Sequence, residues 1–189
     1  MRVPRGHAEL SVVAMARRTV DLLNTLHPGE PPEPPDTERL ERVVAVLREY
    51  GDPDPVDLDQ ADLRRLTTVA PTVRRVFTAT DPDSAAEAVN SLLAQGTGPL
   101  RLSSHHGRTP WHPHLDGDDD APWHEWFLAS SGLALAVLLW DRQRPPGGTC
   151  SAPGCSRVFL AQGSGPTRRY CSRRCATRVR VAAHRARAR

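Results

Sequence analysis

Four cysteines near the end of the chain constrain its fold more than any other feature. They are the only cysteines in the sequence, and they form two close pairs, Cys150-x4-Cys155 and Cys171-x3-Cys175, separated by fifteen residues. Two short turns that each supply two thiolates are the usual frame of a tetrahedral zinc site. Because four cysteines close the coordination sphere, we expect one structural Zn²⁺ bound by Cys150, Cys155, Cys171 and Cys175. Two disulfides or four unconnected thiols are the alternatives, and the paired spacing favours metal.

The residues around the cysteines predict a zinc-ribbon or treble-clef-like finger that is followed by a basic helix. Residues 157–160 and 167–170 are expected to form two short strands, joined by a turn at 162–166. Ser172 is expected to cap a helix over 172–189, which places Cys175 in the first helical turn.

The finger is also strongly basic. Residues 150–189 carry ten arginines and no acid, a formal charge of +10, whereas residues 1–149 carry a formal charge of −7. Charge segregated in this way is typical of a basic segment with an anionic partner. On a helical wheel the arginines of the last helix form two stripes, Arg174, Arg178, Arg185 and Arg189 on one side and Arg173, Arg180 and Arg187 nearly opposite. These seven residues are the candidate nucleic-acid contacts; the alternative is a solvated tail.

Upstream of the cysteines, hydrophobic periodicity predicts a mainly α domain with a small β-hairpin, an α+β arrangement. Apolar stripes at helical spacing indicate helices, the third of them interrupted by Pro71, over 9–26, 36–50, 57–77, 82–95 and 122–140. Alternating residues over 99–115 predict the hairpin, made irregular by two prolines. The segment Pro145-Pro146-Gly147-Gly148 has the composition of a linker. We therefore expect a mainly helical domain over 1–144, a linker over 145–149 and a finger over 150–189, with the two domains unfolding separately.

One stretch of the upstream domain is rich in metal-ligating side chains. Five histidines and four aspartates lie within residues 105–124: His105, His106, His112, His114, His124, Asp116, Asp118, Asp119 and Asp120. A second metal site is one interpretation, and a metal-dependent enzyme that uses this segment is an alternative function. The stretch lacks ordered ligand spacing, such as two histidines one helical turn apart, and the chain has no phosphate-binding loop or nucleophile elbow. An exposed hairpin without a catalytic metal is favoured, and we expect no enzymatic activity.

Two polar residues interrupt the apolar face of the first expected helix. Asp21 and Asn24 lie three positions apart in Val20-Asp21-Leu22-Leu23-Asn24-Thr25. Such a pair either anchors a helix end to a neighbouring loop or contacts a ligand, and anchoring is favoured.

Several of these segments resemble the CGNR zinc-finger family, whose members combine an N-terminal ABATE domain with this kind of finger. Phe159, the run Tyr170-Cys171-Ser172 and the run Cys175-Ala176-Thr177-Arg178 occupy the positions of the family finger, and Asp21 to Thr25 resembles an element near the start of the ABATE domain. Ala176-Thr177 replaces the Gly-Asn of the family motif, Tyr170 stands where tryptophan is usual, and the second cysteine pair is one residue closer. The resemblance implies a regulator of transcription that binds DNA.

The expected function is therefore a zinc-dependent nucleic-acid-binding protein, a DNA-binding transcriptional regulator whose upstream domain is a sensor or interaction platform for a small molecule or protein. Double-stranded DNA is favoured because the basic segment has few aromatic side chains for base stacking. The alternative is a zinc-stabilised protein-interaction module whose basic tail binds an acidic protein surface. We expect no targeting segment, no membrane partner and a cytoplasmic location, since the longest apolar run, 126–140, is too short to span a bilayer and clustered thiols suit a reducing compartment. The sequence favours no particular oligomeric state.

Overall fold

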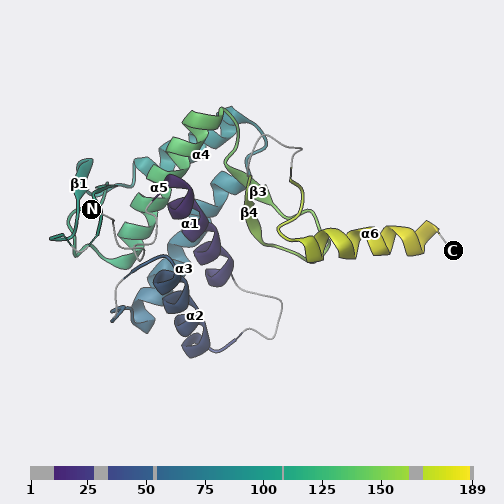
Figure 1. Cartoon of the computed structure of the whole chain (residues 1–189), viewed down its shortest axis with the longest axis horizontal. Helices are drawn as coiled ribbons and strands as arrows, with labels where there is room; N and C mark the ends of the chain where they lie inside the picture. Colours follow the sequence, from purple (N-terminus) through teal and green to yellow (C-terminus); the bar gives the residue numbers. More distant parts are fainter. Residues whose placement is uncertain (1–10, 28–33, 53–54, 108, 162–167, 188–189) are drawn as a thin grey trace, which may run out of the picture.

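The computed structural model describes residues 11–27, 34–52, 55–107, 109–161 and 168–187. Within these residues, five helices build the body of the molecule, and Figure 1 shows their arrangement. The helices are α1 (Val12–Leu26), α2 (Asp36–Glu49), α3 (Gln60–Arg74), α4 (Pro82–Leu93) and α5 (Trp123–Arg142), with a 3₁₀ turn, η1 (Arg75–Phe77), after α3. Helix α5 packs against α1, α3 and α4. The mainly α prediction is confirmed.

Short polar side chains set where three of these helices begin. The Ser11 hydroxyl accepts a hydrogen bond from the backbone N–H of Ala14, and Asp81 accepts one from Ser84 ahead of Pro82. Asp59, two residues after the expected start of the third helix, forms a reciprocal capping box with Asp62. The expected interruption at Pro71 is wrong, because α3 continues through it to Arg74. Buried residues on both sides of Pro71, Ala70 and Val73, hold that turn in the core.

Helix α5 is the central element of the core. Phe127, Ala134 and Leu135 are almost fully buried, and Gly132 lies 3.4 Å, measured from an ideal Cβ position, from Leu92 of α4. A small residue there lets the two helices approach closely. None of the described helices combines the length and the apolar character that crossing a membrane requires.

Two small antiparallel hairpins complete the described structure. Strands β1 (Arg101–Ser103) and β2 (His112–His114) form the hairpin expected between α4 and α5. Strands β3 (Gly147–Thr149) and β4 (Val158–Leu160) form the second hairpin. The predicted strand partner of β4 was wrong: β4 pairs with β3, from the expected linker, while residues 168–170 form no strand. The expected turn at 162–166 lies outside the described residues.

The segment read as a linker is a strand because its glycines permit close packing. A Cβ on Gly147 would lie 2.1 Å from the carbonyl oxygen of Phe159 and 2.7 Å from the ring of Phe77. Only glycine fits between β4 and η1. The glycines that suggested a flexible linker in the sequence therefore allow close packing of the backbone in the structure.

Strand β4 connects the finger to the helical body. Val158 and Leu160 belong to the same buried hydrophobic cluster as the side chains of α1, α3 and α5. In Figure 1 the β3–β4 hairpin lies beside the body, and the last helix, α6 (Arg173–Arg187), projects away from both. The finger is thus joined to the body by a shared core, although one end of it stands free.

Candidate zinc centre and nucleic-acid interface

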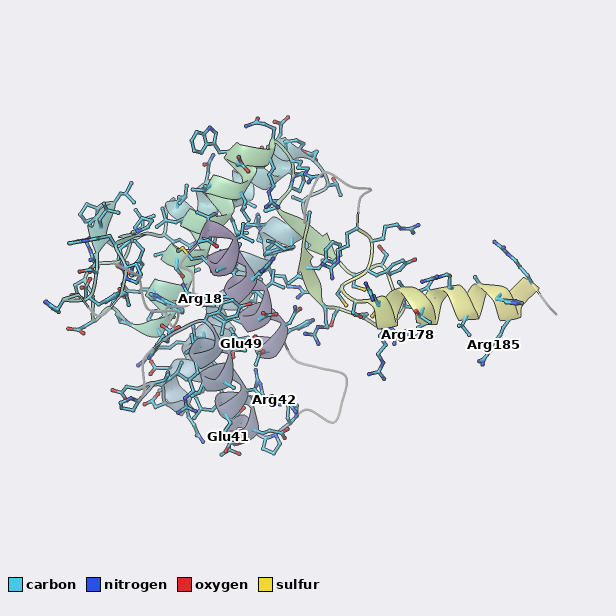
Figure 2. The ribbon with its side chains drawn as sticks, in the orientation of Figure 1. Arg18, Glu41, Arg42, Glu49, Arg178 and Arg185 are labelled. Carbon is cyan, nitrogen blue, oxygen red and sulfur yellow. The ribbon has the colours of Figure 1, made fainter. Side chains whose placement is uncertain are left out.

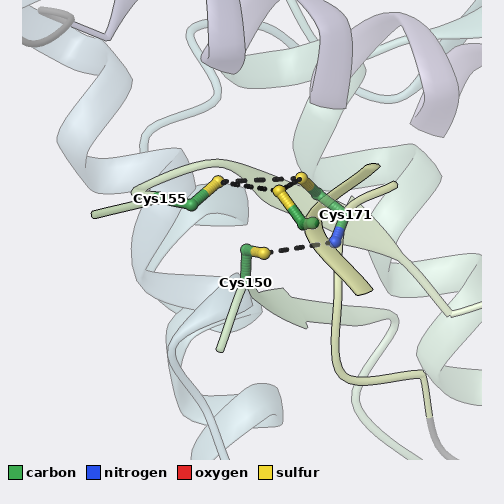
Figure 3. A group of neighbouring side chains, drawn as sticks. Cys150, Cys155 and Cys171 are labelled. Carbon is green, nitrogen blue, oxygen red and sulfur yellow. Dashed lines mark hydrogen bonds between the residues drawn. The ribbon is translucent and has the colours of Figure 1, made fainter. Parts of the chain in front are cut away.

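The four cysteines converge at the base of α6. Their sulfurs all lie within 4.8 Å of one another, and the three pairs among Cys155, Cys171 and Cys175 are 3.7, 3.7 and 3.8 Å apart. Figure 3 shows three of these side chains pointing toward one point, and all four cysteines are free rather than disulfide-bonded. Four thiolates about 2.3 Å from a tetrahedral zinc lie about 3.8 Å apart. The cysteines therefore fit one structural Zn²⁺, and the disulfide alternative is wrong.

Local backbone geometry brings each cysteine to this point. Gly154, with a positive φ of 68°, turns the chain between Cys150 and Cys155. The Ser172 hydroxyl accepts a hydrogen bond from the backbone N–H of Cys175, which caps α6 and sets Cys175 in its first turn, as expected.

The surroundings of the sulfurs shift the pKa values of the cysteines in different directions. Desolvation disfavours the Cys150 thiolate, but hydrogen bonds from the backbone N–H groups of Cys171 and Ala152 outweigh it and lower the pKa of Cys150 to about 7. Desolvation raises the pKa of Cys171 to about 12, and hydrogen bonds with the neighbouring thiols add to that rise. Desolvation also raises the pKa of Cys155. Four thiolates at this spacing thus require a cation among them.

Within the described part of the chain, the contacts that anchor α6 come from its first turns. Val179 packs against the cysteine cluster, and the Arg178 guanidinium donates a hydrogen bond to the carbonyl oxygen of Pro153, at 3.0 Å. From Arg180 to Arg187 every residue is exposed. Figure 2 shows the side chains of Arg178 and Arg185 on this projecting helix, away from the helical body.

The structure places six of the seven candidate arginines on α6 and leaves them accessible. Arg173, Arg174, Arg178, Arg180, Arg185 and Arg187 are all exposed, and Arg189 lies outside the described residues. Among the residues that the structure describes, no ion pair joins α6 to an acidic side chain. The positive charge of the helix is therefore directed to solvent.

A cleft between α1 and the finger adds basic residues that sequence reasoning did not select. Its lining includes Arg17 of α1, Arg157 and Arg168 of the finger, and Arg174 and Arg178 of α6. Arg157 and Arg168 were counted in the charge of the finger, but they lie outside the helical stripes. Nothing in the sequence pairs Arg17 with the finger, because only the folded contact between α1 and β4 brings them together.

Asp21 and Asn24 line the same cleft and make structural contacts. The Asn24 amide donates a hydrogen bond to the carbonyl oxygen of Val158, at 3.1 Å, and accepts one from its backbone N–H, at 2.9 Å. Asp21 accepts a hydrogen bond from the Tyr50 hydroxyl, at 2.6 Å. Asn24 thus fastens α1 to the finger, and Asp21 fastens it to the end of α2.

At the other end of the molecule, three of the five clustered histidines meet. His105, His112 and His114 each place a ring nitrogen within 4.8 Å of the others, while His106 is exposed and does not join them. His114 and Asp116 are 4% and 2% exposed, so the expected exposed hairpin is wrong at these positions. The reason is that Asp116 lies 3.0 Å from Nδ1 of His114 and 2.9 Å from the guanidinium of Arg101 in β1, so that these polar side chains are buried against one another.

Comparison with models of known protein families gives two matches. The model described as "ABATE: Putative stress-induced transcription regulator" matches residues 16–142, and the model described as "CGNR zinc finger" matches residues 148–188. No curated protein matches the chain. The order of the two matches is that of the resemblance seen in the sequence.

Proposed function

This chain belongs to the ABATE family and carries a CGNR zinc finger, and from that premise we propose that it is a transcriptional regulator that binds double-stranded DNA through α6. One observation carries the proposal. A helix of exposed arginines is held at one end by the zinc centre and projects from the body without an acidic partner among the described residues.

The shape and charge of α6 suit the major groove of DNA. Fifteen residues at about 1.5 Å each give a helix of about 22 Å, and the groove accepts one α-helix. Two stripes of arginines on opposite sides allow contacts with the phosphates of both groove walls. Arginine is the side chain best suited to this role, because its planar fork binds phosphate or guanine through two hydrogen bonds.

The position of α6 disfavours docking on the acidic part of the same chain. The helix points away from the helical body, and residues 150–189 contain no acidic residue. An acidic surface on another protein remains the competing partner, and it differs from DNA in lacking a regular array of phosphates.

In this proposal the helical body regulates and does not catalyse. It is the sensor or interaction platform for a small molecule or a protein, and the cleft between α1 and the finger couples its state to α6. The protein acts in the cytoplasm, where reducing conditions keep the four thiols available for zinc.

The test is DNA binding by the zinc-loaded full chain at several salt concentrations. Arg180→Ala, Arg185→Ala and Arg187→Ala are each expected to reduce the slope of log affinity against log salt by roughly one. Arg64→Ala, which removes an exposed arginine from α3 in the body, is the matched control and should leave the slope unchanged.

Two results would overturn the proposal. One is failure of the full chain to bind a mixture of genomic fragments at low salt. The other is equal behaviour of the α6 variants and Arg64→Ala, which would place the DNA contacts elsewhere on the molecule.

A further inference from the structure

Three imidazole rings surround a single point beside the β1–β2 hairpin. The ring centroids are 4.5 Å apart for His112 and His114, 5.0 Å for His105 and His114, and 5.2 Å for His105 and His112. No pair is stacked face to face, since the interplanar angles run from 34° to 70°. The three rings are therefore tilted toward one another, and one nitrogen of each lies within 4.8 Å of a nitrogen of the other two.

The protons of two of these rings can be assigned from their partners. The Nδ1 atom of His112 lies 2.8 Å from the carbonyl oxygen of Pro110, and the Nδ1 atom of His114 lies 3.0 Å from a carboxylate oxygen of Asp116. A carbonyl and a carboxylate can only accept, so each Nδ1 carries a proton. In the neutral rings, each Nε2 atom then presents a lone pair.

The two nitrogen atoms that carry these lone pairs lie close together. The Nε2 atoms of His112 and His114 are 2.9 Å apart. Two acceptors at that separation repel unless they share a proton or both bind one metal ion that lies to the side of the line between them. A shared proton would involve only two rings, and the third imidazole, from His105, indicates the cation.

The ring separations match those of three imidazoles that bind one metal ion. A metal about 2.1 Å from a ring nitrogen lies about 3.2 Å from the ring centroid, so rings at angles of about 90° to 110° have centroids about 4.5 to 5.2 Å apart. The observed range is 4.5 to 5.2 Å.

A second layer of polar residues holds the ligands in place. Asp116, which orients His114, is paired with the Arg101 guanidinium at 2.9 Å. Arg101 also binds Asp119, whose other oxygen accepts a hydrogen bond from the Ser103 hydroxyl, at 2.6 Å, and lies 3.6 Å from Nδ1 of His105. Carboxylates that orient metal-bound histidines in this way are a regular feature of zinc and other transition-metal sites.

We propose that His105, His112 and His114 bind a divalent first-row transition-metal ion, a second metal in addition to the zinc of the finger. Three neutral imidazoles suit zinc and its neighbours and do not suit magnesium or calcium, which require oxygen ligands. Three protein ligands leave at least one coordination position for water or an exogenous anion. The site lies at the β1–β2 hairpin and does not depend on DNA binding.

The stoichiometry of zinc in the full chain tests this proposal. After equilibration with a small excess of zinc and removal of unbound metal, elemental analysis should give about two equivalents for the unaltered chain. His105→Ala and His112→Ala, each at a partly exposed position, should retain about one. His106→Ala, at an exposed histidine of the same turn, is the matched control and should retain two.

Cobalt substitution assigns the metal that is lost. Absorption from thiolate-to-cobalt charge transfer arises only at the cysteine site, so it should be unchanged in the His105→Ala and His112→Ala chains. The weaker ligand-field absorption should fall in the same two variants. One equivalent of zinc in the unaltered chain under these conditions overturns the proposal, whether or not the variants fold, and so does a full second equivalent in both histidine variants.

Discussion

Asn24 shows how a single amide can join two parts of a chain that are far apart in sequence. Both of its hydrogen bonds go to the backbone of Val158, a residue that is 1% exposed. If the amide is removed, the N–H and C=O groups of Val158 on that side lose their partner in a place that water reaches poorly. An unsatisfied buried group costs more free energy than the hydrogen bond itself contributes.

We predict that Asn24→Ala lowers the free energy of unfolding by roughly 1–3 kcal/mol, through the two backbone groups left without partners. Chemical denaturation of the zinc-loaded chain measures the change. Asn90→Ala is the matched control, because Asn90 is an exposed asparagine within α4 and shares the small gain in helix propensity. Equal stability of the two variants would show that the Val158 contact contributes little.

The cysteine pKa values predict how zinc binding depends on pH. In the metal-free chain at neutral pH, Cys171, with a pKa of about 12, and Cys155, with a raised pKa, are protonated, whereas the zinc-bound form holds thiolates. Binding thus releases at least two protons, and affinity should fall at least a hundredfold for each pH unit below neutrality, where Cys150, with a pKa of about 7, also takes up a proton. Competition with a chelator at two pH values measures this, and a pH-independent affinity would contradict the thiolate assignment.

At the scale of elements, the β3–β4 hairpin belongs to the core of the body and to the zinc finger at once. Val158 and Leu160 of β4 pack into the body. Cys150 directly follows β3, and Cys155 lies shortly before β4. The expectation that the two parts unfold separately is therefore difficult to reconcile with the shared core.

We predict that removing zinc destabilises the helical body as well as the finger. Chelation should lower the thermal midpoint of the whole helical signal, because loss of the zinc centre frees one end of β4 from its position. Far-UV circular dichroism follows the transition, and restored zinc is the control for chelator effects. A body that melts at an unchanged temperature after chelation would support separate units instead.

The elements that sequence patterns predicted well are those with strong local signals. Three such signals lie within the elements that they predict: the Asp81-Pro82 start of α4, the long apolar run of α5, and the alternation around β1 and β2. The zinc ligands were likewise readable from spacing alone. Strand β3 was missed because Gly147-Gly148-Thr149 has no alternation of apolar residues, and its strand character comes from contacts with Phe77 and Phe159.

The sequence placed the histidines in one metal-ligating stretch, but an exposed hairpin was favoured over a second metal site because nothing local indicates that three of the rings meet. His112 and His114 share a face of β2, but His105 reaches them through a turn in which His105 and His106 both have positive φ, 46° and 59°. Non-glycine residues seldom adopt this backbone conformation, so no pattern of spacing could indicate it.

At the scale of the whole molecule, the basic helix α6 projects from a body whose formal charge is negative. All the acidic residues that the structure describes precede the zinc centre in the chain, and the basic helix α6 projects away from the body. DNA binding should consequently depend on α6 as a continuous rod, and stability of the body should not.

We predict that Ala183→Pro abolishes most of the DNA affinity without loss of zinc or of body stability. Ala183 is exposed in the middle of α6, and proline there costs the helix roughly 3 kcal/mol and misdirects Arg185 and Arg187. DNA binding, zinc content and the thermal midpoint of the body are the three measurements. Ala183→Ser keeps the helix and should bind DNA nearly as well as the unaltered chain. Full DNA affinity of the proline variant would argue against DNA binding by a continuous α6 helix.

Because α6 is held near the zinc centre at its first turns, a small rotation there moves the far end of the helix through a larger distance. Because the helix is about 22 Å long, a rotation of about 10° at its base would sweep its tip through about 4 Å. Successive base pairs of a duplex are spaced about 3.4 Å apart, so such a rotation changes the register of the tip by about one base pair. Asn24 and β4 fix the base of α6 to the helical body. If α6 lies on a duplex as we propose, slight adjustments within that body would therefore shift its tip between neighbouring base pairs.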